Sequence, residues 1–243
     1  MSWNTLSLHF KQQYEGAFRY LDRCGEFMLA AVEELDLLPG ETKPTGAKLE
    51  RPESGLTVTV DTLELVATQE LPGEDARAFP EICITLAGLV KTHFQPKGVI
   101  RNGFACKSYW PIVDVDALLS ASLRYGGTAH LDLGKQLGLV PAHKRLDLSF
   151  SSGSMELHVM LHPVTFEKVS INRHQPGFNA SSGQKRRAQR LNASADRFSR
   201  PLSHALVLET DLMEVDPPSN SLDQHFCEMK RYAETLRKYF DFK

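Results

Sequence analysis

The stretch Leu-Thr-Val-Thr-Val-Asp-Thr-Leu-Glu-Leu-Val at positions 56–66 decides how this chain is expected to fold. Val58 and Val60 alternate with threonines, and alternation with β-branched residues is typical of a strand. We predict one strand over residues 56–66, with a short strand at 45–50 before it. Two long helical patterns flank this pair of strands.

The first helical pattern is a stripe of apolar residues spaced by three and four positions. Its members are Tyr14, Phe18, Leu21, Gly25, Met28, Val32 and Leu35. Pro39 and Gly40 are a stop signal for a helix. Gly25 lies inside the stripe, where glycine costs about 1 kcal/mol relative to alanine. We expect that close approach to a sheet explains this glycine.

The second helical pattern begins at Pro80, because proline suits the first turn of a helix. Its apolar face consists of Phe79, Ile82, Cys83, Leu86, Val90 and Phe94. Strands at 4–10 and 99–113 complete the order βαββαβ, which is that of a ferredoxin-like domain. We therefore predict an α+β fold in which residues 1–113 form a ferredoxin-like subdomain, with both helices on one face of a four-stranded sheet.

The second half predicts a smaller, mostly antiparallel sheet over residues 114–243. Strands are expected at 147–150, 156–161 and 204–215, with a turn at 151–154. A C-terminal helix closes this sheet and has Ser221 and Gln224 in a capping-box spacing. Its apolar stripe consists of Leu222, Phe226, Met229, Ala233, Leu236 and Phe240. The stripe suits packing on the sheet, and it also suits a homodimer through this helix.

A basic insertion, residues 168–204, is the unusual part of the chain. The whole chain of 243 residues carries a net charge of −2, which excludes a strongly basic histone-like protein. The insertion has eight Lys or Arg and one acid, Asp196, so it carries +7 and the remaining residues carry −9. Arginine forks suit phosphate oxygens, which predicts binding of nucleic acid or another polyphosphate.

The residues expected to contact phosphate are Arg173, Lys185, Arg186, Arg187, Arg190 and Arg197. A solvated surface loop and a contact with an acidic protein surface explain the same composition. The predicted order of elements is similar to that of RNA-binding and RNA-processing proteins built on ferredoxin-like domains, including CRISPR endoribonucleases. The glycine-rich loop near the C-terminus that is typical of those endoribonucleases is absent from this sequence.

Several polar residues are candidates for chemistry. Asp114 and Asp116, with Asp132, suit a divalent cation, whereas Asp116 alone suits a helix cap. His174 and His204 bracket the basic insertion and are candidates for a histidine acid or base. The leading alternative to polyanion binding is therefore a metal- or histidine-dependent hydrolase or nuclease. The sequence predicts no cofactor, and a non-enzymatic interaction module is the third alternative.

His158 and His162 have the spacing of a helical metal site, but the run around them predicts a strand. Residues four apart on a strand share a face and lie about 13 Å apart. We therefore expect two separate histidines there.

Nothing at the N-terminus has the pattern of a signal peptide, and the apolar runs are too short for a transmembrane helix. These features predict a cytoplasmic protein with reduced cysteines and no membrane partner.

Overall fold

The computed structural model describes residues 3–72, 76–112, 145–165, 204–218 and 221–240. The elements up to residue 112 are β1 (Asn4–Glu15), α1 (Tyr20–Leu35), β2 (Leu38–Lys43), β3 (Gly46–Arg51), the 3-10 turn η1 (Pro52–Ser54), β4 (Leu56–Val60), β5 (Glu64–Glu70), α2 (Phe79–His93) and β6 (Gly98–Ile112). Those after it are β7 (Leu146–Ser152), β8 (Met155–Thr165), β9 (His204–Val215) and α6 (Leu222–Tyr239).

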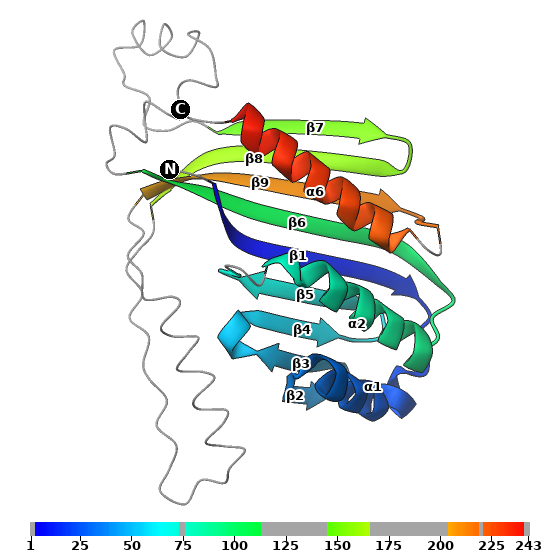
Figure 1. Ribbon diagram of the computed structural model, residues 1–243. Helices are drawn as coiled ribbons and strands as arrows, with labels where there is room; N and C mark the ends of the chain where they lie inside the picture. The colour runs from blue at the N-terminus through cyan, green and yellow to red at the C-terminus, as the bar shows by residue number, and fades with distance from the viewer. Residues whose placement is uncertain (1–2, 73–75, 113–144, 166–203, 219–220, 241–243) are drawn as a thin grey trace, which may run out of the picture.

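The strands form one open sheet in the order β2-β3-β4-β5-β1-β6-β9-β8-β7. Every neighbouring pair in this order is antiparallel. The three described helices lie on one face of the sheet, so the described elements leave the opposite face without a helix (Figure 1). The predicted α+β class with mostly antiparallel strands is thereby confirmed.

Asp61 divides the predicted strand 56–66 into a hairpin. Its carboxylate Oδ1 accepts hydrogen bonds from the backbone N–H groups of Leu63 and Glu64, at 2.7 and 2.8 Å. Aspartate commonly reverses the chain in this way, by hydrogen-bonding the backbone two residues on. The prediction of a single strand is wrong because apolar residues continue on both sides of the turn and hide it.

The ferredoxin-like arrangement is not confirmed, because four strands lie between α1 and α2 instead of two. One of the two extra strands arises because the Asp61 turn divides the predicted strand 56–66 into β4 and β5. The other is β2, which contains the predicted helix stop Pro39-Gly40. In the described sheet β2 is an edge strand, where proline is tolerated since it need not donate to a neighbour.

α1 packs on a face that is rotated from the predicted stripe and overlaps it in part, since Met28, Val32 and Leu35 of the stripe lie partly buried against the core. Tyr14 belongs to β1, and the helix begins at Tyr20. Tyr20 and Phe27 are buried against Phe94, with ring centroids 5.2 and 5.0 Å apart. Phe18 is exposed instead. Helical spacing alone does not show which of two neighbouring apolar stripes will pack. Among the described residues, a side chain at Gly25 would meet nothing outside its own helix within 4 Å, so the predicted close approach to a sheet is wrong.

The apolar faces of α2 and α6 are as predicted. All six residues named for α2 are buried, and the six named for α6 are buried or partly buried. The predicted capping box of α6 is wrong. Ser221 has no capping hydrogen bond and instead donates to Glu214 Oε2 at 3.2 Å. The predicted strands around the 151–154 turn are confirmed as β7 and β8.

The expected second, smaller sheet is part of the first one. β9 pairs with β6 from Arg101↔Val215 to Ile112↔His204, which joins β7, β8 and β9 to the strands of residues 1–112. The core is shared as well, since Phe226 of α6 contacts Phe104 of β6 with ring centroids 5.0 Å apart. The division at residue 113 into two subdomains stays a prediction.

Candidate functional site on the helix-free face

A row of residues crosses the centre of the sheet on its helix-free face. In register, His9 pairs with Ala105, Ala105 with Asp211, and Asp211 with His158. Directly paired residues of an antiparallel sheet point to the same face. Four strands that are distant in sequence therefore bring two histidines and a carboxylate onto one surface, with a small alanine between them.

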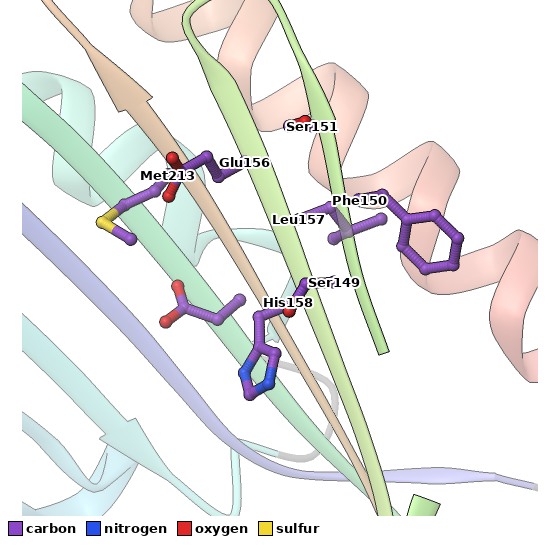
Figure 2. A pocket seen from close by; sticks show the side chains of 8 residues that line it. Ser149, Phe150, Ser151, Glu156, Leu157, His158 and Met213 are labelled. Carbon is purple, nitrogen blue, oxygen red and sulfur yellow. The ribbon is translucent and has the colours of Figure 1, made fainter. Parts of the chain in front are cut away.

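Two shallow hollows meet at His158 and Asp211. The larger, of about 360 Å³, has Ala105 among its lining residues. Its polar lining consists of Ser7, His9, Thr68, Glu70, Lys107, His158, Glu209, Thr210 and Asp211. The second, of about 290 Å³, lies over the β7–β8 hairpin (Figure 2). Figure 2 shows His158 and Phe150 pointing in different directions from this hairpin.

Glu209 is the best-paired carboxylate of the site. Its two oxygens bind His162 Nε2 at 2.9 Å and Lys107 Nζ at 3.1 Å. The hydrogen bond from His162, followed by Lys107, lowers the pKa of Glu209 to about 2. Glu209 is therefore an anion at neutral pH, and Lys107 is already paired with it.

His158 is held by Asp147 of β7, with its Nε2 hydrogen-bonded to the Asp147 carboxylate. Arg145 contacts the same carboxylate at 3.0 Å. The bond from His158 is the main reason that the pKa of Asp147 is lowered. His158 and His162 thus have different partners, which confirms the prediction of two separate strand histidines.

His9 and Asp211 carry perturbed acidities on the two sides of Ala105. Burial lowers the pKa of His9, whose Nδ1 lies 2.9 Å from Thr68 Oγ1. Partial loss of water raises the pKa of Asp211, although its side chain still reaches solvent, and His9 and His158 oppose that rise. A histidine and a carboxyl group that line one hollow are the combination used in acid–base chemistry.

Among the described residues, neither His9 nor His158 belongs to a group that could hold a metal ion. Within the described ranges, no three His, Cys, Asp or Glu side chains are placed to hold a metal ion. The arrangement can hydrogen-bond a ligand and move protons. With Glu70, Glu209 and Asp211 in its lining, the larger hollow does not suit a phosphate group.

Almost all site residues predicted from the sequence lie outside the described residues. These are Asp114, Asp116, Asp132, Arg173, His174, Lys185, Arg186, Arg187, Arg190 and Arg197. His204 is described and is the first residue of β9, paired in register with Ile112 and Thr165. The structure does not bring His204 into the two hollows on the helix-free face.

Sequence reasoning missed His9 and Asp211. Each lies in a strand with alternating polar and apolar residues, and this pattern shows that they point away from the core. The pattern carries no information on which strands are neighbours.

Comparison with models of known protein families, and with curated proteins, finds no match to this chain. None of the described helices is long and apolar enough to cross a bilayer.

Proposed function

We propose that this protein binds nucleic acid or another polyphosphate through the basic segment 168–204. The observation that carries the proposal is the charge separation along the chain, with +7 in this segment and −9 in the rest. Arg173, Lys185, Arg186, Arg187, Arg190 and Arg197 are the proposed phosphate contacts. The acidic lining of the larger hollow supports assigning the phosphates to the segment instead.

The test is fluorescence-anisotropy binding to short single- and double-stranded DNA and RNA between 50 and 300 mM salt. Affinity should fall steeply with salt, because each neutralised phosphate contributes about 0.7–0.9 to the logarithmic slope. Replacing Arg186, Arg187 and Arg190 by alanine should reduce that slope by about two to three.

The matched control removes the same charge from other parts of the surface. Lys91, Lys230 and Lys238 are exposed lysines of α2 and α6. Replacing these three by alanine should leave the slope nearly unchanged. An equal loss in both triple variants would mean that net charge, and not the basic segment, binds the polyanion. No binding at 50 mM salt would end the proposal.

A histidine-dependent hydrolase or nuclease is the second candidate, favoured by one observation. His9 and His158 line the same hollow as Asp211. His9→Ala and His158→Ala should each abolish cleavage of an RNA oligonucleotide in EDTA, whereas His93→Ala on α2 should not. If cleavage needs a divalent cation and is lost in Asp116→Asn, the metal-dependent version with Asp114 and Asp116 is supported instead. Absence of RNA cleavage in both conditions removes the nuclease proposal.

A non-enzymatic interaction module, with a homodimer through α6, is the third proposal. The apolar stripe of α6 packs on the sheet of its own chain, where Phe226 and Met229 are buried. Leu236 is partly buried in this packing, so a dimer would use the exposed flank of α6, where Tyr239 is 74% exposed. Tyr239→Glu should break such a dimer, as measured by the mass in solution. We also propose a cytoplasmic location, with which the free thiols of Cys24, Cys83, Cys106 and Cys227 agree.

A further inference from the structure

The larger hollow on the helix-free face contains two carboxylates that no neighbouring cation neutralises. Its described lining includes one lysine, Lys107, and this lysine already binds Glu209 at 3.1 Å. Within the described part of the chain, Glu70 and Asp211 have no ion-pair partner. Partial loss of water raises the pKa of both carboxyl groups. A cationic group bound in the hollow would replace the water that these two side chains have lost.

A buried hydroxyl group lies in the same hollow and has no hydrogen-bond partner among the described residues. It belongs to Ser7, which is only 7% exposed. In register Ser7 lies between Glu70 of β5 and Lys107 of β6, on the helix-free face. Buried hydroxyl groups are normally hydrogen-bonded, because without a partner they lose the bonds that they made to water. A ligand that donates a hydrogen bond to Ser7 would restore the missing bond.

The dimensions of the hollow favour a small, elongated ligand. Its volume of about 360 Å³ lies within the range of small-molecule sites. Glu70 on β5 and Asp211 on β9 are three strand spacings apart, which is ~14 Å at the backbone. This is too far for one ammonium group to bind both carboxylates. Between them, Ala105 and Met160 offer a small and an apolar side chain on which methylene groups can lie.

We propose that this hollow is a binding site for a small aliphatic polyamine. One ammonium group binds Asp211, a second binds Glu70 and the Ser7 hydroxyl, and the carbon chain lies over Ala105. An ammonium group donates three hydrogen bonds and carries the charge that the two carboxylates lack. A metal ion does not explain the same residues, since no three potential ligands in the described ranges are placed to hold one.

Isothermal titration calorimetry of the full chain with spermidine tests the proposal. At about 150 mM salt, attraction between separated surface charges is largely screened. The wild type should bind one spermidine with a dissociation constant between micromolar and millimolar. Asp211→Asn and Glu70→Gln should each weaken binding at least fivefold. Glu81→Gln is the matched control, because it removes the same charge from an exposed position of α2 on the other face of the sheet and should bind like the wild type (Figure 1).

Two variants that keep the net charge distinguish a built site from general attraction to an acidic surface. Ala105→Leu fills the floor of the hollow, and Ser7→Ala removes the buried hydroxyl group. Each should weaken spermidine binding at least threefold, with an unchanged far-UV circular dichroism spectrum. Butylamine, which has one ammonium group, should bind the wild type at least tenfold more weakly than spermidine does.

The readout is binding alone, so its outcome is separate from that of the RNA-cleavage experiment. A wild type that does not bind spermidine would overturn the proposal. Equal losses in Glu81→Gln and Asp211→Asn, or full affinity in both Ala105→Leu and Ser7→Ala, would overturn it as well, because spermidine would then be attracted by net charge and not held in the hollow.

Discussion

At the scale of single residues, His225 is the most heavily perturbed histidine that the structure describes. Its side chain is completely buried, with Nδ1 3.5 Å from Glu214 Oε2. In the described part of the chain neither ring nitrogen has a hydrogen-bond partner. Burial lowers the pKa of His225 to about 4, and Glu228 opposes this shift. His225 is therefore a neutral core residue at pH 7.

This burial makes stability depend on pH. Below about pH 6.5 the unfolded chain protonates His225, whereas the folded chain binds that proton near pH 4. The contribution of neutral His225 to the free energy of unfolding is therefore fully present above pH 6.5. It falls by up to about 3 kcal/mol as the pH drops to 4. Urea unfolding of wild type and His225→Leu at pH 7 and 4.5 measures this.

The free energy of unfolding of the variant, relative to the wild type, should rise at the lower pH. His93→Gln on α2 is the control and should show little such change. An equal difference between wild type and His225→Leu at both pH values would contradict the assignment.

At the scale of elements, the Asp61 turn determines how many strands the first half contains. One side-chain oxygen replaces two backbone acceptors, and the chain reverses between β4 and β5. Tyr14 supports the same turn, since its hydroxyl donates to the backbone oxygen of Asp61 at 2.7 Å. The helices were easier to predict than this hairpin because a stripe over four turns is a longer signal than a two-residue turn.

Asp61→Ala should destabilise the protein by about 1–2 kcal/mol, because it removes two charge-assisted hydrogen bonds to the backbone. Asp61→Asn keeps the acceptor oxygen and should recover most of this loss. Chemical denaturation of both variants measures the difference. Equal losses in the two variants would show that the negative charge, and not the turn geometry, stabilises the hairpin.

At the scale of the whole molecule, one continuous sheet and one shared core predict cooperative unfolding. Leu212 of β9 is buried in the same cluster as Phe10 of β1. Leu212→Ala should therefore lower the free energy of unfolding by about 2–5 kcal/mol for the molecule as a whole. Leu148→Ala, on the partly exposed strand β7, should cost less than about 1 kcal/mol.

The measurement is thermal unfolding followed by far-UV circular dichroism and by tryptophan fluorescence. Both signals should show one transition at the same temperature, and Leu212→Ala should move them together. Two separate transitions would instead support independent subdomains on either side of residue 113.

Local patterns by themselves determined the α+β class, the packing faces of α2 and α6, and most strands. Each of these follows from residues close together in sequence, through periods of two or 3.6. The charge of segment 168–204 is likewise a property of the sequence, and its proposed role awaits the binding experiment.

Only the tertiary structure decided which strands are neighbours, and with them the position of the candidate site. His9, Asp211 and His158 meet because β1, β6, β9 and β8 are adjacent in the sheet. Alternation along a strand is the same whatever strand lies beside it, so no local pattern could reveal this meeting. The choice between two apolar stripes on α1 was open for the same reason, since long-range packing of Tyr20 and Phe27 against Phe94 settled it.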